Sequence, residues 1–257
     1  MKALIASLGV LGLAASAAVA VSSPESAAPA AAPAGGTVTA KFTWDGKLPD
    51  PLKPLTIDAA KSQGCCPPGV DMDTTDRKRL IDKNGGISDV VVTLEPKGHE
   101  VEIEVREEPY TMDQQKCRFE PHLLVVPVGN TVVWKNSDSV NHNVNVKAKK
   151  NGSFNNNVAS GGEEKRVMEH AETVSVGCDI HPWMGATVFV TDTPFAAQTG
   201  RDGTFTLEGV TPGTYKVEWW HESLGKGKLD DITVADGGTV EIAEKLKEKS
   251  SGGRRRR

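Results

Sequence analysis

Several common signatures are missing from this sequence. It has no Gly-x-Ser-x-Gly motif, so a serine or cysteine hydrolase has little support. Helical periodicity is scarce, and no long apolar run follows residue 20, so we expect no membrane span in the mature chain. The formal net charge of −4 leaves the body of the chain acidic, which argues against nucleic-acid binding. What remains is a globular composition, 38% hydrophobic over 257 residues, enough for one large or two small domains.

The two ends of the chain differ from its body. Lys2 and the Ala-rich apolar run after it, with Ala18-Val19-Ala20 as a small-x-small site, predict a cleaved secretory signal at residues 1–20 rather than an uncleaved anchor. Residues 21–36 have the Pro, Ala, Ser and Gly content of a disordered linker, and residues 247–257 form a basic tail with four terminal arginines. We therefore expect export, to the periplasm or the cell surface.

Short extended runs fill the body of the chain. The runs TVTAKFTW, VEIEV, HLLVVPV, TVVWKN, TVFVTD and TYKVEWW alternate apolar with polar residues or are β-branched, and Gly, Pro, Asn and Asp separate such runs. One short helix is expected at 55–62, in LTIDAAKS, and a loop at 61–84. The pattern predicts an all-β protein built from antiparallel sandwiches.

The four cysteines are Cys65, Cys66, Cys117 and Cys178. An oxidising compartment permits disulfides, and one bridge from Cys117 to either Cys65 or Cys66 is possible. Such a bridge leaves Cys178 and one other thiol free. Metal binding would give a reason for Cys178 to stay unpaired.

The stretch CDIHPWM brings three soft-metal ligand types within seven residues: Cys178, His181 and Met184. In a loop between adjacent strands, two-residue gaps let these side chains converge. A thiolate, an imidazole and a weak thioether suit copper that shuttles between Cu(I) and Cu(II), whereas zinc rarely recruits Met. The alternative is structural, with a buried or disulfide-bonded Cys, a loop His and a core Met.

A second imidazole has to come from elsewhere in the chain. His142, in NSDSVNHNVNV, follows the run TVVWKN, and a sandwich can bring its loop beside the CDIHPWM loop. Two His and one Cys with a distant axial Met form the trigonal arrangement of electron-transfer copper centres. The neighbouring Asn143 could join the two loops by hydrogen bonds.

These motifs, in this order, resemble the cupredoxins, the plastocyanin and amicyanin family. FEPHLLVVPVGNTVVWKNSDSVNHNV is followed by CDIHPWMGATVFV, and the Cys-x2-His-x2-Met spacing is closest to that of amicyanin. The resemblance covers residues 99–192 and implies a Greek-key β-sandwich. It implies one mononuclear type 1 copper ion with His142, Cys178, His181 and Met184 as ligands.

The resemblance also implies how electrons would pass. In such proteins the loop histidine is partly exposed and forms the electron path, which here would be His181. Pro182 and Trp183 would then form an apolar collar where a redox protein docks. The donor and acceptor are not identified by the sequence.

A second module follows the first. GRDGTFTLEGVTPGTYKVEWW resembles the hairpin of the carboxypeptidase regulatory-like (transthyretin-like, or prealbumin-like) sandwich, which implies a smaller β-sandwich at residues 193–246. The strand GGTVTAKFTW and residues 37–98 in general look like the start of the same sandwich. We expect the cupredoxin to be inserted between the two parts, while a tandem arrangement remains the alternative. Pairing of residues 37–44 only with cupredoxin strands would exclude the insertion.

The remaining histidines are weaker candidates. His122, five residues after Cys117, could join an auxiliary metal site but more often such a residue lies at a strand edge. His221 ends a strand and could hydrogen-bond across a domain interface.

The sequence therefore predicts an exported one-electron carrier with one copper ion. A copper-storage, delivery or sensing protein would use the same ligands, but it would be favoured by exposed Met- or His-rich tracts, which are absent. Multicopper oxidases and copper nitrite reductases need further clusters, typically His-x-His pairs, and the chain has none, so we expect no enzyme. A purely structural surface module is the third possibility.

Overall fold

The computed structural model describes residues 35–58, 60–62 and 72–248. The predicted signal, most of the linker, Cys65, Cys66 and most of the basic tail lie outside these residues. The described part is all-β, as predicted, and contains no helix. Accordingly, no helix within it is long and apolar enough to cross a membrane.

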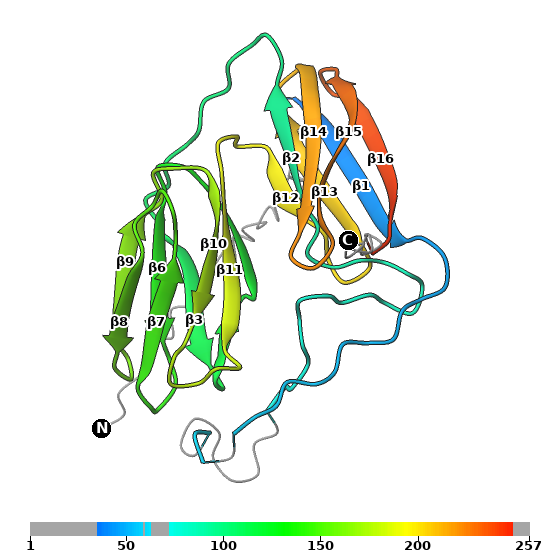
Figure 1. The fold of residues 1–257 in the computed structure, drawn as a ribbon. Coiled ribbons are helices and arrows are strands. Elements are labelled where there is room, and N and C mark those ends of the chain that lie inside the picture. Colours follow the sequence, from blue (N-terminus) through cyan, green and yellow to red (C-terminus); the bar gives the residue numbers. More distant parts are fainter. Residues whose placement is uncertain (1–34, 59, 63–71, 249–257) are drawn as a thin grey trace, which may run out of the picture. The chain divides into compact units, whose positions relative to one another are not determined.

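One pair of sheets is built from the middle of the chain, and we call it the central sandwich (Figure 1). Its five-stranded sheet has the order β5-β11-β10-β7-β8 and its four-stranded sheet the order β4-β3-β6-β9. The strands are β3 (Tyr110–Gln115), β4 (Arg118–Glu120), β5 (Leu123–Pro127), β6 (Thr131–Asn136), β7 (His142–Lys147), β8 (Phe154–Val158), β9 (Glu163–Val167), β10 (Glu172–Gly177) and β11 (Gly185–Thr191).

Alternation along these strands creates the core of the central sandwich. Successive side chains point to opposite faces of a strand, so every second residue of β10, Val174 and Val176, is buried. The inward-facing residues of both sheets join in one cluster that includes Trp134 and Met112, both fully buried. Cys178 and Met184 belong to the same cluster, so the predicted metal loop lies at the edge of a packed core.

The second pair of sheets, which we call the terminal sandwich, combines both ends of the described chain. Its sheets have the orders β13-β1-β16 and β12-β2-β14-β15. The strands are β1 (Gly36–Trp44), β2 (Val91–Pro96), β12 (Ala196–Gln198), β13 (Thr204–Val210), β14 (Gly213–His221), β15 (Gly225–Val234) and β16 (Thr239–Leu246). A separate core cluster, with Phe42, Leu94 and Tyr215 fully buried, lies in this sandwich.

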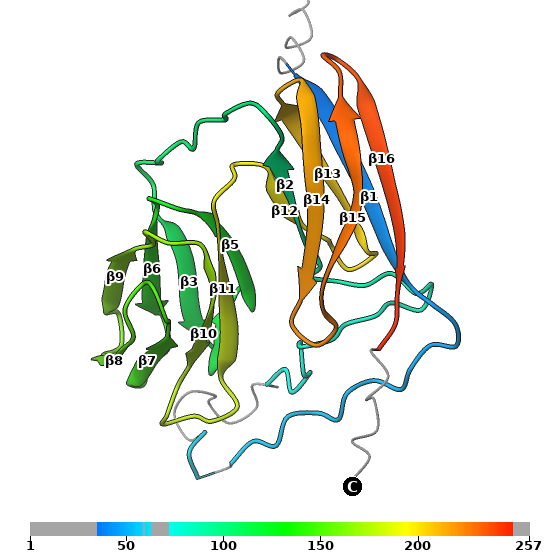
Figure 2. The ribbon, with the colours of Figure 1, turned by 45° about the horizontal axis from the view of Figure 1, so that its top comes forward.

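The first and last strands lie side by side (Figures 1 and 2). β1 pairs in parallel with β16 from Thr37 opposite Thr239 to Trp44 opposite Leu246, and antiparallel with β13 on its other edge. On the second sheet, β2 pairs with β14 and β12. This is the pairing that an inserted central sandwich requires, because β3 to β11 form the other two sheets.

A tight turn at Asp202-Gly203 comes directly before β13. Gly203 has a φ of +78°, and a Cβ at this position would lie 2.3 Å from the Phe42 carbonyl oxygen. The Gly203 carbonyl accepts a hydrogen bond from the Phe42 amide at 2.8 Å. Glycine is therefore required here both for the left-handed backbone and for the close approach of β1.

Two local predictions are wrong. VEIEV, at 101–105, alternates but forms no strand, because no neighbouring strand supplies hydrogen bonds; instead the Asn130 side chain donates to the Glu104 carbonyl and accepts from the Arg106 amide. Of residues 55–62, 55–58 have no regular structure and 60–62 form a turn rather than a helix, in which the amides of Lys61 and Ser62 donate to the Asp58 carbonyl. One such turn is too short to propagate as a helix.

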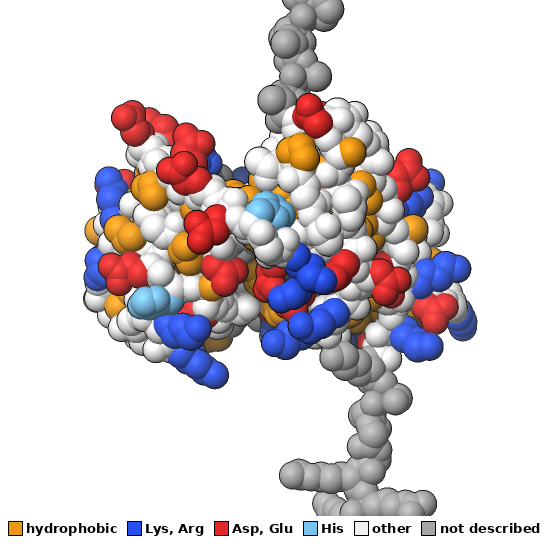
Figure 3. Space-filling view, turned by 90° about the horizontal axis from the view of Figure 1, so that it is seen from above, with side chains coloured by type: hydrophobic (Ala, Val, Ile, Leu, Met, Phe, Trp, Pro, Cys, Tyr) orange, Lys and Arg blue, Asp and Glu red, His pale blue; other side chains and the backbone are white. Residues whose placement is uncertain are grey.

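Charged side chains of both signs are interspersed on the face of the molecule that Figure 3 shows. In the central sandwich Lys165 pairs with Glu163, and in the terminal sandwich Lys228 pairs with Glu218. Exposed pairs of this kind contribute about 0 to 1 kcal/mol each, so their main effect is solubility.

Candidate metal centre

The CDIHPWM segment is a closed loop between β10 and β11. The Cys178 amide donates to the Met184 carbonyl at 3.2 Å, and the Met184 amide donates to the His181 carbonyl at 2.9 Å. Gly177 and Gly185 pair directly below the loop. These contacts bring Cys178, His181 and Met184 together at one end of the central sandwich. We call this end the metal pole.

His142 reaches the same pole from β7. β7 pairs antiparallel with β10, with Asn145 opposite Gly177, so the start of β7 lies beside the residues that follow β10. His142 is the first residue of β7 and its side chain is fully buried. The sheet register therefore brings together two side chains that are 36 positions apart in the sequence.

Three donor atoms converge at this pole. His142 Nδ1 lies 2.8 Å from His181 Nδ1 and 3.9 Å from Cys178 Sγ, and His181 Nδ1 lies 3.6 Å from Cys178 Sγ. An ion at ordinary distances of about 2.0 to 2.3 Å can contact all three atoms at once. Met184, 1% exposed, packs in the same core cluster as Cys178. The donor set fits copper, whose electron-transfer sites combine two imidazoles, a thiolate and a weak thioether.

Cys117 lies near the same histidines but is a different kind of group. Its Sγ is within 4.8 Å of ligand atoms of His142 and His181. Cys117 is disulfide-bonded, whereas Cys178 is free. A disulfide sulfur carries no thiolate, so Cys178 is the sulfur that can bind a metal here. The expected partners of Cys117, Cys65 and Cys66, lie outside the described residues.

Asn143 joins the two loops. Its Oδ1 accepts from the Asp179 amide at 2.7 Å and lies 3.2 Å from Cys178 Sγ. Its Nδ2 donates to Asn155 Oδ1 on β8. The buried amide side chain thus fixes the sulfur and the backbone of the Cys178 loop relative to β7.

Asp138 is a site residue that the sequence reasoning missed. Its Oδ2 lies 2.8 Å from His142 Nε2, and both side chains are buried. The signal was present as an Asp four residues before the candidate His, in DSVNH. Spacing alone did not reveal it, because the loop between β6 and β7 has no regular period.

The surroundings of the pole shift the pKa values of Cys178, His181 and His142. Burial acts to raise the pKa of the Cys178 thiol, but hydrogen bonding with His142 and with the backbone of the two loops brings that pKa below its usual value. Burial, reinforced by the charge of His142, lowers the pKa of His181 and favours its neutral, ligating form. Burial also acts to lower the pKa of His142, but Asp138 and Cys178 outweigh it and raise that pKa.

His181 is not exposed, contrary to what the resemblance implied. Only 3% of its surface is accessible, and its Nε2 lies 3.0 Å from the Lys61 carbonyl oxygen. The side chains of Leu55 and Ile57, which precede Lys61 in the chain, pack against the central core. The segment before β2 therefore covers the ring that was expected to face solvent.

The expected apolar collar is also only partly exposed. Trp183 is 7% exposed, and its Nε1 donates to the Cys117 carbonyl at 3.2 Å. Pro182 is exposed, and so is Ile180, by 40%. Trp183 thus supports the loop from within.

A cleft of about 340 Å³ borders the pole on another side. Cys178 and Met184 line it together with Pro182, Asp179 and Lys147. Cys178 and Met184, rather than His181, therefore border this cleft.

The other predicted candidates have structural roles. His122 Nδ1 lies 3.1 Å from the Gly185 carbonyl oxygen, and its Nε2 lies 2.7 Å from Glu222 Oε2, so both ring nitrogens are engaged. His221 does not hydrogen-bond across an interface as expected. Its buried Nδ1 accepts from the amides of Ser223 and Leu224 and closes the turn between β14 and β15.

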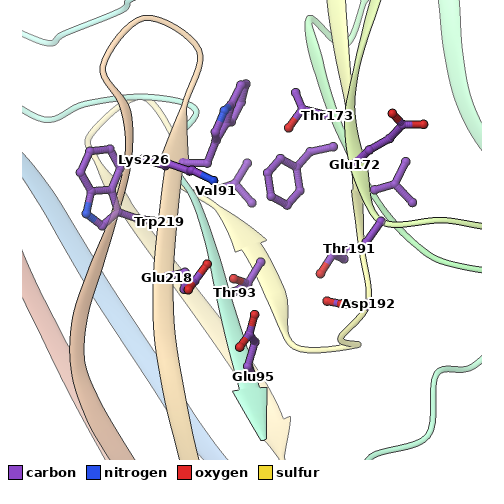
Figure 4. A pocket seen from close by; sticks show the side chains of 14 residues that line it. Val91, Thr93, Glu95, Glu172, Thr173, Thr191, Asp192, Glu218, Trp219 and Lys226 are labelled. Atoms are coloured by element: carbon purple, nitrogen blue, oxygen red, sulfur yellow. The ribbon is translucent and has the colours of Figure 1, made fainter. Parts of the chain in front are cut away.

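Figure 4 shows a second pocket, of about 300 Å³, lined by residues of β2, β10, β11 and β14. None of the proposed ligands lines it. Two of its carboxylates are already engaged, since Glu218 pairs with Lys228 and Glu172 accepts from backbone amides at Lys149 to Asn151. We assign no function to this pocket.

Solved structures of copper proteins resemble part of the chain. A purple cupredoxin from Nitrosopumilus maritimus is 26% identical over 32% of this chain and 99% of its own, with a TM-score of 0.29. Amicyanin from Paracoccus versutus is 21% identical over 34% and 86%, with a TM-score of 0.30. A copper-containing nitrite reductase from Thermus scotoductus is 21% identical over 38% and 26%, with a TM-score of 0.33. No curated protein matches the chain.

Two family models match the chain. The carboxypeptidase regulatory-like domain matches residues 173–247, and thus begins inside β10, although β10 and β11 pair within the central sandwich. The copper-binding proteins of the plastocyanin/azurin family match residues 106–208 and so include the whole metal pole. Both predicted resemblances are confirmed, and residues 106–208 are similar to a family of copper-binding proteins.

Proposed function

We propose that this protein binds one copper ion through His142, Cys178 and His181, with Met184 as a weak axial ligand, and that it carries single electrons. The observation that carries this proposal is the convergence of the two Nδ1 atoms and the free Cys178 sulfur within 4 Å of one another. The match of the same segment to copper-binding proteins supports the identity of the metal.

The residues around the pole have the properties that electron transfer requires. When bound, copper supplies the one-electron Cu(I)/Cu(II) couple. The closed loop and the Asn143 bridge fix the donors in place, which limits rearrangement between oxidation states. Burial of all four side chains, at 0 to 4% exposure, excludes bulk water from them.

This burial favours a carrier over an enzyme. A catalytic metal keeps an open position for water or substrate, as zinc enzymes illustrate. Here the proposed ligands are buried in or beside a packed core, and among the described residues no second cluster of metal-binding type is found beside this pole. The absence of His-x-His pairs from the sequence points the same way.

Location and partners extend the proposal. The N-terminal sequence supports export, and the partners would be redox proteins in the periplasm or at the cell surface. Because Lys61 covers His181, we place the docking face at exposed Ile180 and Pro182, beside the cleft that reaches Cys178 and Met184.

A copper-holding or delivery protein is the second candidate. The cover over His181 favours it, since a buried ligand increases the distance from copper to a redox partner. Electron self-exchange distinguishes the two functions, because a carrier exchanges quickly between reduced and oxidised molecules and a holding protein does not.

The proposal is tested by a redox titration of the mature, copper-loaded protein. We expect one copper per chain and a reversible one-electron titration, with fast self-exchange seen as line broadening in NMR spectra of mixed samples. The exposed His170→Gln variant should behave as the wild type, whereas Cys178→Ser should lose the reversible couple. Binding of several copper ions, or irreversible reduction in the wild type, would reject the carrier function.

A further inference from the structure

We propose that Asp138 is a positioning residue that fixes the tautomer and raises the donor strength of His142, and so lowers the reduction potential of the copper site. The inference rests on the proposed function for the potential, but its tautomer part concerns the metal-free chain alone. The juxtaposition that carries it is the 2.8 Å contact between Asp138 Oδ2 and His142 Nε2 at two buried side chains.

The contact determines where the imidazole proton lies. An ionised carboxylate can only accept, so the Nε2 of His142 must donate. A neutral ring that is protonated at Nε2 has its lone pair at Nδ1, and Nδ1 is the atom that faces Cys178 and His181. The carboxylate therefore keeps a proton on Nε2 and leaves Nδ1 as the nitrogen that can bind a metal.

Two backbone amides hold the Asp138 carboxylate in place. The Cys117 amide donates to Asp138 Oδ2 at 2.8 Å, and the Lys116 amide donates to Oδ1 at 2.5 Å. Both residues have left-handed backbones, with φ of 55° and 51°, which turns two successive amides toward one anion.

The two histidines are consequently unequal. His181 has a neutral backbone carbonyl, that of Lys61, on its outer nitrogen, whereas His142 has a carboxylate. A carboxylate that accepts from the outer nitrogen of a ligating imidazole raises the basicity of that imidazole. Loss of such a carboxylate typically costs about 10- to 100-fold in metal affinity. A stronger donor favours Cu(II) over Cu(I), which lowers the potential.

The test compares Asp138→Asn with Asp113→Asn. Asn at 138 keeps the size and can still accept from His142, but it removes the charge. Asp113 accepts from the Ser137 amide and hydroxyl, next to Asp138 in the chain, so its Asn variant removes one charge from the same turn without a contact to His142. We expect the Asp138→Asn potential to rise by about 59 mV, the equivalent of a tenfold loss of preference for Cu(II), and the Asp113→Asn potential to move much less.

A second readout needs no copper. In the metal-free wild type, ¹⁵N chemical shifts of His142 should show a proton on Nε2, and in Asp138→Asn a mixture of rings with and without that proton. Equal potentials in the two variants, or an Nε2 without a proton in the wild type, would overturn the role of Asp138. A wild type that binds no copper but shows the Nε2 proton would reject the proposed function while the tautomer assignment stands.

Discussion

At the scale of single residues, Asn143 is the contact on which the metal pole most depends outside its ligands. Its Oδ1 receives the Asp179 amide and lies beside the Cys178 sulfur, and the side chain is 4% exposed. Removal of a buried partner leaves a backbone donor unpaired, which costs about 1 to 3 kcal/mol.

We therefore expect Asn143→Ala to lower the free energy of unfolding by about 2 kcal/mol and the copper affinity at least about tenfold. Chemical denaturation and competition with a Cu(I) chelator measure the two effects. Asn145→Ala, which removes only an exposed contact to Asp179, is the matched control. Similar losses in both variants would show that Asn143 has no special role.

His221 makes stability depend on pH. Burial lowers its pKa from 6.5 to about 4. Since the unfolded chain then binds the proton more tightly than the folded one, stability is full above about pH 6.5 and is lost as the pH falls from about 6.5 to 4. A shift of this size corresponds to about 3 kcal/mol.

Urea denaturation of the metal-free protein between pH 7 and 4 measures this dependence. In His221→Gln the pH slope should be shallower than in the wild type, while His170→Gln should keep the wild-type slope. An unchanged slope in His221→Gln would mean that the ring is protonated in the folded state.

At the scale of elements, the turn before β13 is a point of close contact. In Gly203→Ala the new Cβ would lie 2.3 Å from a backbone oxygen that cannot move independently of β1. Gly237 also has a positive φ, of +64°, but a Cβ there would meet nothing within 4 Å. Gly237→Ala therefore carries the conformational strain alone, about 1 kcal/mol.

We expect Gly203→Ala to lower the unfolding free energy by at least about 2 kcal/mol more than Gly237→Ala, because steric displacement adds to strain. Calorimetric melting of both variants tests the difference. Equal melting temperatures would contradict the close packing of this turn against β1.

The sequence was informative where one chemical pattern coincides with one local structure. The CDIHPWM loop was recognisable because its ligand types are rare neighbours, and the strands around it because they alternate regularly. Strands such as β8 (FNNNV) and β9 (EEKRV) were missed, since they are polar and owe their conformation to neighbours in the sheet. The alternation of VEIEV misled for the opposite reason, because the segment has no neighbouring strand.

Long-range contacts limited the prediction of the site. His142 was identified from its surroundings in the sequence, but the cover over His181 comes from Lys61, 120 positions away. Asp138 was missed because its importance lies in a contact with a ring nitrogen and in two amides of another hairpin. The contacts of Lys61 and Asp138 follow no periodic pattern in the sequence, so they cannot be predicted from it.

At the scale of the whole molecule, each sandwich has a core cluster of its own. Phe42 on β1 is fully buried in the terminal core, and Val174 on β10 is fully buried in the central core. The metal pole belongs to the central core alone, so damage to one core should not spread equally to the copper site.

We expect Phe42→Ala to destabilise the terminal sandwich by about 3 to 5 kcal/mol while the copper-thiolate absorption melts near the wild-type temperature. Val174→Ala should show the reverse, with earlier loss of the copper signal. Simultaneous loss of copper absorption and overall structure in Phe42→Ala would show that the two cores unfold as one.

The central claim is that Cys178 forms a thiolate bond to a single copper ion. Visible absorption and electron paramagnetic resonance of the Cu(II)-loaded mature protein, beside Cys178→Ser, test it most directly. We expect an intense blue band and a narrow copper hyperfine splitting, both lost in the variant. A colourless wild type with ordinary tetragonal Cu(II), unaffected by the substitution, would contradict it.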